Sequence, residues 1–228
     1  MHIYCDFYGT ISSQDATDLI LSRFADPHWE RIEEQWREGK IGSAQCMQSQ
    51  IELIRASRDQ LDAALDGIDI DSTFPAFVNF CHSQNISLSV ISDGVDYFIQ
   101  RILARHRLPP LRVIANRLIM RNDGDPVNYR LFTPHAHGAC ASAAGVCKCR
   151  FVCHRSDVSV YIGDGRSDFC VANVPDLVFA KGVLAEFCDQ HDIAFIPFQQ
   201  FGDVTAALKK TLPSYPESAP QTWARAFA

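Results

Sequence analysis

Acidic and hydroxyl side chains follow three apolar segments of the chain, at the point where each segment ends. The first segment ends at Asp6, the second runs into Ser92-Asp93-Gly94, and the third reaches Asp164, with Asp168 four residues further on. One such end alone is typical of a turn or a helix cap. Three acidic ends at one place repel each other unless a divalent cation such as Mg²⁺ lies between them. Because an Asp beside Mg²⁺ can act as a nucleophile toward phosphorus, the pattern predicts phosphoryl transfer.

These ends meet only if the three segments are strands of one parallel sheet. Short β-prone runs predict strands at residues 1–6, 86–91, 112–120, 158–162, 177–180 and 194–195. Helices are expected at residues 74–82 and 97–108, after Gly165, up to His191, and from Phe201. Strands that alternate with helices predict an α/β fold, a Rossmann-like, doubly wound parallel sheet with helices on both faces. Ligands of such sheets bind beyond the carboxyl ends of the strands.

Residues 15–65 differ from the rest, because their apolar side chains recur at helical spacing and none alternate as in a strand. Turn signals of Pro and Gly divide this stretch into about four helices. We therefore expect an all-helical domain at residues 13–72, inserted into a core domain formed by residues 1–12 and 73–228.

The composition excludes several classes of protein. The chain has 228 residues, a formal net charge of -6, 47% apolar residues and 21% charged residues, which rules out a disordered chain. An acidic balance without a basic stripe argues against a nucleic-acid partner. No apolar run approaches the roughly 18 residues of a membrane span, and no secretory signal is visible. We expect a cytoplasmic monomer or homodimer with a small-molecule partner and no membrane partner.

Four ordered motifs resemble those of the haloacid dehalogenase (HAD) superfamily. They are Asp6-Phe7-Tyr8-Gly9-Thr10, Ser92-Asp93-Gly94, Lys148 and Gly163-Asp164-Gly165-Arg166-Ser167-Asp168. The helical insertion after the first motif resembles the cap of the phosphoserine-phosphatase-like branch. Within that branch the chain is most similar to the phosphatases of methionine salvage, which act on a methylthio-keto-pentenyl 1-phosphate. Residues 39–41, 75–81, 92–98 and 179–180 carry this likeness.

The resemblance implies a Mg²⁺-dependent phosphatase that acts on a small phosphorylated metabolite. Asp6 would be the nucleophile, forming an aspartyl-phosphate, and would also bind Mg²⁺. Asp164 and the backbone carbonyl of Tyr8 would be further metal ligands, and Asp168 would hold the metal shell.

The resemblance also implies a phosphate-binding set of Ser92, Asp93, Gly94 and Lys148. The Ser92 hydroxyl and the Gly94 amide would hold a phosphate oxygen, and Lys148 would neutralise nucleophile and phosphate together. These roles suit phosphoryl transfer, which depends on positioning and on charge compensation.

Tyr8 departs from the phosphatase pattern. HAD phosphatases have Asp two residues after the nucleophile, where it protonates the leaving oxygen and then activates water. A phenol with a pKa near 10 is a far weaker base at neutral pH, because it remains protonated there. The Asp-x-Tyr-Gly-Thr form is similar to the first motif of 2-haloacid dehalogenases, which need no metal, but those enzymes lack the metal motif around Asp164. Three alternatives stay open: an impaired phosphatase, a dehalogenase-like hydrolase, and a catalytically inactive protein that binds phosphate esters.

In this branch the cap largely selects the substrate. Phosphoserine phosphatases use a cap Arg to bind the substrate carboxylate, and residues 45–48 offer none, which disfavours phosphoserine. Asp15 lies where that branch has a substrate-facing acidic residue, although an acidic residue at the start of a helix is equally typical.

A group of thiols and imidazoles surrounds Lys148 in the sequence. Its members are His135, His137, Cys140, Cys147, Cys149, Cys153 and His154. They exceed the four ligands of a zinc site, but their spacing matches no standard zinc knuckle. We expect free thiols.

Overall fold

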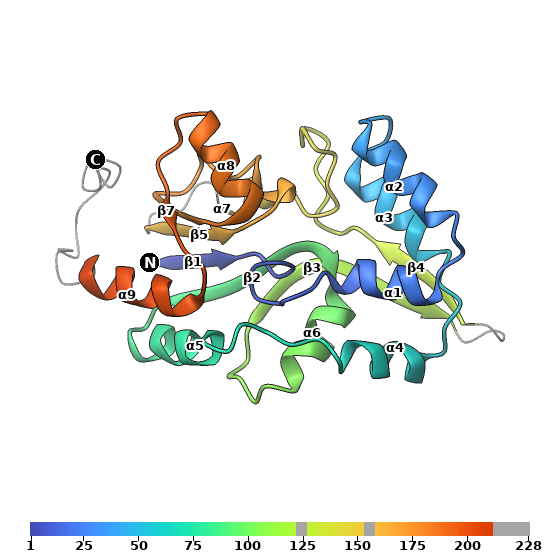
Figure 1. Ribbon diagram of the computed structural model, residues 1–228, viewed down its shortest axis with the longest axis horizontal. Coiled ribbons are helices and arrows are strands. Elements are labelled where there is room, and N and C mark those ends of the chain that lie inside the picture. Colours follow the sequence, from blue (N-terminus) through green and yellow to red (C-terminus); the bar gives the residue numbers. More distant parts are fainter. Residues whose placement is uncertain (122–126, 153–157, 212–228) are drawn as a thin grey trace.

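The structure of the protein, a computed structural model, is an α/β fold, and the part of the chain that it describes forms one seven-stranded sheet (Figure 1). It describes residues 1–121, 127–152 and 158–211. The strands are β1 (His2–Cys5), β2 (Ser87–Val95), β3 (Arg112–Arg121), β4 (Asn128–Phe132), β5 (Ser159–Gly163), β6 (Leu177–Ala180) and β7 (Ile196–Pro197). The predicted α/β class is confirmed.

The strand order β4-β3-β2-β1-β5-β6-β7 puts β1 in the middle of the sheet. Neighbouring strands pair in parallel, except β3 and β4, which are antiparallel. The chain builds β2 and β3 on one side of β1 and then returns to the other side, so the strand order reverses at β1. Cys5 pairs with both Val90 of β2 and Ile162 of β5. The three polar strand ends therefore lie at one edge of the sheet.

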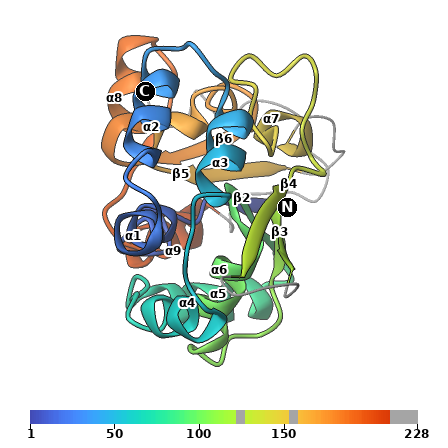
Figure 2. The ribbon, with the colours of Figure 1, turned by 90° about the vertical axis from the view of Figure 1, so that its right-hand side faces the viewer.

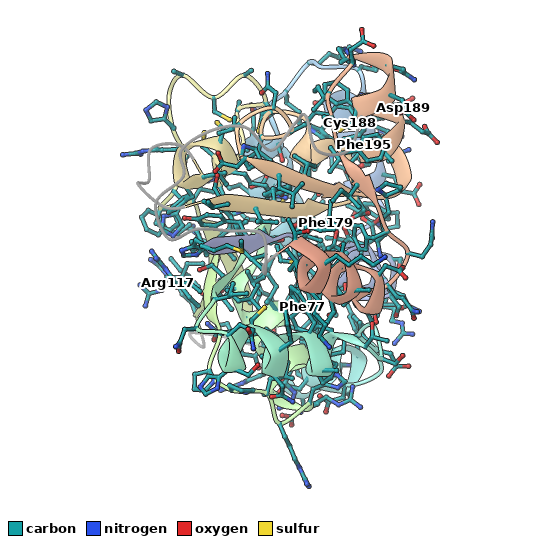
Figure 3. The ribbon with its side chains drawn as sticks, turned by 90° about the vertical axis from the view of Figure 1, so that its left-hand side faces the viewer. Phe77, Arg117, Phe179, Cys188, Asp189 and Phe195 are labelled. Atoms are coloured by element: carbon teal, nitrogen blue, oxygen red, sulfur yellow. The ribbon has the colours of Figure 1, made fainter. Side chains whose placement is uncertain are left out.

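Helices cover both faces of the sheet, as Figures 1 and 2 show. One face has α5 (Phe74–Ser83), α6 (Asp96–Ala104) and α9 (Phe201–Thr211), and the other has α7 (Lys148–Val152) and α8 (Gly182–Gln190). Side chains of β1 alternate between the two cores, with Ile3 in the first and Tyr4 in the second. Figure 3 shows Phe77 and Phe179 in the first core, and Cys188 of α8 in the second.

Four helices lie between β1 and α5, beyond the carboxyl end of β1 in Figure 1. They are α1 (Ala16–Phe24), α2 (Trp29–Arg37), α3 (Ser43–Ile51) and α4 (Arg58–Leu65). Asp15 begins α1 by accepting hydrogen bonds from two backbone amides, and Ser57 begins α4 in a capping box with Gln60. In the part of the chain that the structure describes, no helix is long and apolar enough to cross a membrane.

The second polar segment differs from the expected strand end. Instead of closing before Ser92, β2 runs to Val95, because its pairing with β3 resumes there after a register shift that starts at Ile91. A register shift of this kind re-aims side chains locally, and it leaves Ser92-Asp93-Gly94 between two regularly paired parts of one strand.

The helix expected after Gly165 is a single 3₁₀ turn, η1 (Arg166–Asp168). The carboxylate of Asp168 accepts hydrogen bonds from the backbone amides of Asp164 and Gly165, both at 3.0 Å. After Asp168 the chain continues in turns whose amides bond three residues back, such as Val171 N to Asp168 O at 3.0 Å, instead of in an α-helix.

One helix ends earlier than predicted, and one strand starts later than predicted. The helix expected at residues 97–108 ends at Ala104, because Arg107 has a φ of 50°, which a right-handed helix cannot include. The strand expected at residues 194–195 starts at Ile196, because a hydrogen bond from Ile193 N to Cys188 O still holds the turn after α8. The strand β4 and the helix α7 are additions to the predicted elements.

Candidate active site

Asp6 directly follows the central strand. Its backbone amide extends the parallel ladder by donating to Ile162 O of β5 at 2.9 Å, which fixes the residue at the carboxyl end of β1. The Asp6 residue is only 5% exposed. A carboxylate buried to this degree needs compensating charge or hydrogen bonds.

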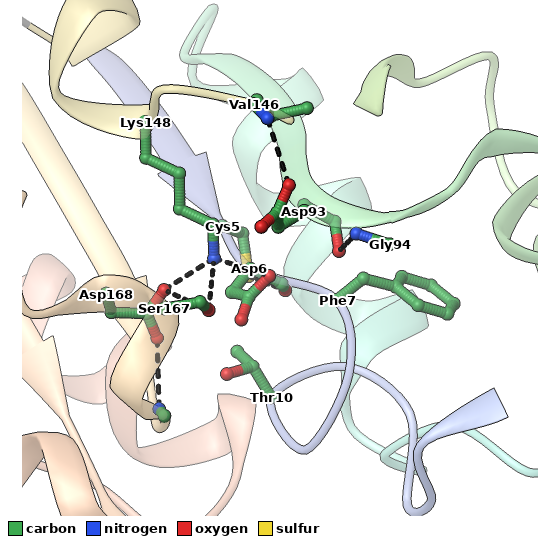
Figure 4. A network of polar contacts seen from close by, with 12 residues as sticks. Cys5, Asp6, Phe7, Thr10, Asp93, Gly94, Val146, Lys148, Ser167 and Asp168 are labelled. Carbon is green, nitrogen blue, oxygen red and sulfur yellow. Dashed lines mark hydrogen bonds and ion pairs between the residues drawn. The ribbon is translucent and has the colours of Figure 1, made fainter. Parts of the chain in front are cut away.

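Lys148 provides that compensation. Figure 4 shows its side chain reaching from the start of α7 toward Asp6, Ser167 and Asp168. The Nζ atom lies 3.0 Å from Asp6 Oδ1 and 2.6 Å from Asp168 Oδ1, and it donates to Ser167 Oγ at 3.0 Å. Since Lys148 is 1% exposed, its ammonium group is held by these oxygens rather than by water. Lys148 therefore contacts side chains of both the first and the fourth motif.

The fourth motif brings two more carboxylates to the same place. Tyr161 of β5 donates its hydroxyl to Asp168 Oδ1 at 2.6 Å, and Thr10 donates to Asp164 Oδ1 at 2.5 Å. Carboxylate oxygens of Asp6, Asp164 and Asp168 all lie within 4.8 Å of one another. The structure therefore gathers the three aspartates that the sequence pattern singled out.

Negative charge exceeds positive charge in this group. Burial raises the pKa of Asp6 above its ordinary value; Lys148 opposes this rise, while Asp168 and Asp164 add to it. Burial also raises the pKa of Asp164. Burial alone would lower the pKa of Lys148, but the charges of Asp168 and Asp6 raise it overall. The charge of Lys181 also lowers the pKa of Asp164, so three close carboxylates have two ammonium groups near them. The three carboxylates form a hard oxygen donor set, which fits a divalent cation such as Mg²⁺.

The second motif lies beside this group. Ser92 Oγ accepts a hydrogen bond from Gly94 N at 3.1 Å, and both residues line the same cavity as Asp6. The carboxylate of Asp93 is engaged elsewhere, because its Oδ1 accepts from Val146 N at 2.9 Å, as Figure 4 shows.

Tyr8 points its ring at the second motif. A β-carbon on Gly94 would lie 2.1 Å from Tyr8 Cε2, so the ring occupies the space that any larger residue at position 94 would need. The phenol oxygen is buried, with the Thr17 side chain and the Val95 backbone as its polar neighbours. Burial raises the pKa of Tyr8, which makes the phenolate still less available at neutral pH.

A cavity of about 520 Å³ opens over these residues, toward α1, α2 and α3. Trp36, Cys46 and Met47 give it apolar walls, and the carboxylates of Asp15, Asp18 and Glu33 also line it. Desolvation and the charge of Asp18 raise the pKa of Asp15 to about 6. Asp15 thus both caps α1 and faces the cavity, so the two interpretations of this residue are compatible.

The thiols near Lys148 lie beside the site. Cys147 and Cys149 flank Lys148, and their sulfur atoms are 3.3 Å apart. Within the described ranges, no group of three cysteines or histidines brings its ligand atoms as close together as the three aspartates do. Cys153 and His154 lie outside the described residues.

Several residues that contact the site were missed in the sequence. Thr10 and Ser167 stand inside recognised motifs, so their neighbourhood was a usable signal. Tyr161 lies within a buried strand two residues before Gly163, where an apolar role is the ordinary expectation. Asn116 and Ser43, which contact Asp93, come from separate elements, and nothing in the sequence links them to it.

Comparisons with known proteins agree with this geometry. A family model described as Putative Phosphatase matches residues 1–180. The 2-hydroxy-3-keto-5-methylthiopentenyl-1-phosphate phosphatase of Bacillus cereus (strain 03BB102) is 29% identical over 218 residues, which cover 93% of this chain and 97% of that protein.

Solved structures are similar in fold at low identity. A substrate-bound phosphoserine phosphatase superposes with a TM-score of 0.61 and 18% identity, covering 94% of this chain and 98% of the other. A phosphoserine phosphohydrolase-like protein from Francisella tularensis gives a TM-score of 0.66 and 16% identity, with coverage of 91% and 99%. Since the matched family model spans the three aspartates, Lys148 and the second motif, the chain belongs to the putative phosphatase family.

Proposed function

We propose that the protein is a Mg²⁺-dependent phosphomonoester hydrolase that acts on a small phosphorylated metabolite through an aspartyl-phosphate on Asp6. One observation carries the proposal. Asp6, at the carboxyl end of the central strand, faces the Nζ of Lys148 at 3.0 Å, with carboxylates of Asp164 and Asp168 within 4.8 Å. A nucleophile, a cation for the phosphate charge and a hard donor set for a metal are thus side by side.

In the first step, an oxygen of Asp6 attacks phosphorus, the bond from phosphorus to the ester oxygen breaks, and the leaving alkoxide takes a proton from water to become the alcohol. Lys148 neutralises charge on Asp6 and on the transferring phosphoryl group. Ser92 and Gly94 bind a phosphate oxygen by hydroxyl and amide. Asp93 contributes to this segment through its main chain, because its carboxylate has other partners. Water then attacks the aspartyl-phosphate, which releases phosphate and restores Asp6.

Asp6, Asp164 and the backbone carbonyl of Tyr8 would hold Mg²⁺, with Asp168 holding the surrounding shell. When bound, the metal supplies charge stabilisation for the phosphoryl oxygens. The excess of buried carboxylates over cations in this group supports the assignment.

In this proposal, Tyr8 limits the rate of phosphoester hydrolysis. No carboxylate stands two residues after Asp6, so the leaving alkoxide and the later attacking water both lack the usual acid and base. We propose that alkyl phosphates are hydrolysed slowly and that the aspartyl-phosphate accumulates.

We propose that residues 13–72 act as a cap domain over the core formed by residues 1–12 and 73–228. Helices α1, α2 and α3 line the cavity together with core residues, which supports this division. The name of the Bacillus cereus relative suggests a methylthio-keto-pentenyl 1-phosphate as substrate. The apolar walls of Trp36 and Met47 suit a thioether chain, and Asp15 would face the hydroxyl groups.

A panel of phosphoesters assayed with Mg²⁺ and with EDTA tests the proposal. We expect Mg²⁺-dependent phosphate release that Asp6→Asn abolishes, while Asp189→Asn, an exposed carboxylate on α8, leaves it unchanged. Beryllium fluoride or vanadate should bind at the Asp6 carboxylate. Halide release from a 2-haloacid without metal would instead support a dehalogenase, and binding of phosphoesters without turnover would support a binding protein.

A further inference from the structure

The carboxylate of Asp93 has partners in three distant parts of the chain. Ser43 Oγ, at the start of α3, donates to Asp93 Oδ2 at 2.6 Å. Val146 N and Asn116 Nδ2 donate to the other oxygen at 2.9 and 3.1 Å. Asp93 is 8% exposed, so these bonds replace water around a buried carboxylate. A buried carboxylate that accepts hydrogen bonds from three segments holds those segments together.

The start of α3 also docks on the loop before α7 through main-chain contacts. Ser43 N donates to Ser142 O at 3.3 Å, and Ala44 N donates to Ala143 O at 3.0 Å. A β-carbon on Gly42 would lie 2.5 Å from the Cβ of Ala143, so Gly42 permits the approach. The first backbone amides of a helix have no hydrogen-bond acceptor within the helix. Carbonyl groups of this loop accept hydrogen bonds from two such amides of α3.

The loop that receives α3 is the one that carries Lys148. Val146, which Asp93 holds by its amide, lies two residues before Lys148 in the chain. Asp93 itself stands between Ser92 and Gly94. The Asp93 carboxylate thus connects three segments. They are the phosphate-binding segment, the segment that carries Lys148, and α3, which lines the cavity with Cys46.

We propose that Asp93 is a positioning residue that latches α3 onto the core and, with the same carboxylate, fixes the segment that carries Lys148. The proposal rests on the proposed hydrolase function and names a device that prepares its site. With α3 latched, its side chains line the cavity and Lys148 is in place for Asp6. Without the latch, only a fraction of the enzyme molecules can bind substrate. The apparent affinity is then the affinity of the latched form multiplied by that fraction.

Amide hydrogen exchange followed by mass spectrometry tests the latch without reference to catalysis. A hydrogen bond to a buried charged group is worth roughly a tenfold change in an opening equilibrium, or more. Ser43→Ala should therefore speed exchange of residues 43–51 by about tenfold. The matched control is Ser142→Ala, which removes a hydroxyl from the same interface but keeps the carbonyl that Ser43 N uses. The control should exchange like the wild type.

Steady-state kinetics on the best phosphoester separates the two parts of the proposal. Ser43→Ala loosens α3 alone, so we expect KM to rise, by at most about tenfold, while kcat stays within about twofold. Asp93→Ala also frees the Lys148 segment, so kcat should fall as well. Ser142→Ala should leave both constants unchanged.

Unchanged exchange of residues 43–51 in Ser43→Ala would overturn the latch, whether or not the protein releases phosphate. A fall in kcat without a rise in KM for Ser43→Ala would also overturn it. If the wild type shows no phosphate release but Ser43→Ala speeds exchange, the latch stands and the hydrolase function fails. If Asp93→Ala does not fold, the partly exposed Ser43 carries the test alone.

Discussion

The ring of Tyr8 lies directly against Gly94, so that a β-carbon at position 94 would be 2.1 Å from Tyr8 Cε2. Tyr8 follows β1, and Gly94 lies within the neighbouring strand β2, which pairs with β1 up to Cys5 and Val90. The large ring at position 8 therefore fits because residue 94 has no side chain.

This contact predicts the behaviour of Gly94→Ala. The added methyl group displaces the Tyr8 ring and should lower the free energy of unfolding by about 1–3 kcal/mol. In a Tyr8→Asp background the ring is gone, so the same change should cost clearly less. Urea unfolding of the four proteins gives the coupling between the two sites. Additive losses would show that the ring does not contact position 94.

The strands and helices were largely predictable where an apolar run or a helical spacing of apolar residues defines their bounds. The strand at Leu177–Ala180 and the start of α9 at Phe201 have the predicted bounds, because apolar runs and helical spacing define them. Strand β4 has a readable alternation, with Tyr129 and Leu131 buried between exposed neighbours, but it is only 5 residues long. Helix α7 also has 5 residues, and its Lys148 turns inward for an ion pair that no local pattern reveals.

The candidate site was predictable as far as its residues follow strands. Asp6 and Asp164 stand at strand ends, so strand order alone brings them together. The partners of Asp93 were not predictable, because Ser43 and Asn116 reach it across 50 and 23 residues of chain. Such contacts depend on how α3 and β3 pack, and a single sequence contains no signal for that packing.

Removing the cation tests the electrostatic balance of the site. Lys148→Met leaves Asp6 and Asp168 as buried carboxylates without a counter-charge, so the free energy of unfolding should fall by about 3–5 kcal/mol. Saturating Mg²⁺ should recover part of this loss, because a bound cation replaces the missing charge. Urea unfolding with and without Mg²⁺ measures both effects. Lys210→Met, an exposed change on α9, should shift stability by less than about 0.5 kcal/mol.

Metal binding should depend on the fourth motif. Asp164→Asn removes one anionic oxygen donor while keeping the side-chain shape, so the Mg²⁺ affinity should fall about tenfold or more. Isothermal titration calorimetry of Mg²⁺ into wild type and variant measures the change. The surface variant Asp189→Asn should bind Mg²⁺ as the wild type does. Equal affinity in Asp164→Asn would show that this carboxylate is structural.

We predict that the thiols beside Lys148 do not bind zinc. Cys147 and Cys149 lie with their sulfurs 3.3 Å apart, next to a lysine whose ammonium group is engaged by carboxylates. We expect purified protein to contain no stoichiometric zinc and its cysteines to react with a thiol reagent after unfolding. One zinc per chain by elemental analysis, lost together with Cys140→Ser or Cys147→Ser, would contradict the prediction.

Tyr8→Asp decides between the phosphatase and its alternatives. If Tyr8 stands in place of the acid that protonates the leaving alkoxide, restoring a carboxylate should raise turnover of alkyl phosphates by about 10²- to 10⁴-fold. Nitrophenyl and acyl phosphates, whose leaving groups depart without a proton, should gain less in the first step. Tyr8→Asn is the matched control, because it removes the ring and its contact with Gly94 without adding a base.

The same variant should change which species accumulates. In the wild type the aspartyl-phosphate on Asp6 waits for an activated water, so rapid-quench experiments should show a burst of alcohol before phosphate appears. Tyr8→Asp should abolish this burst because its carboxylate activates the water, whereas Tyr8→Asn should retain it. Tyr8→Phe should match the wild type, since a buried phenol with a raised pKa takes no part in proton transfer. If Tyr8→Asp releases no more phosphate than the wild type, while the wild type frees halide from a 2-haloacid without Mg²⁺, then the tyrosine belongs to a dehalogenase and the phosphatase proposal is wrong.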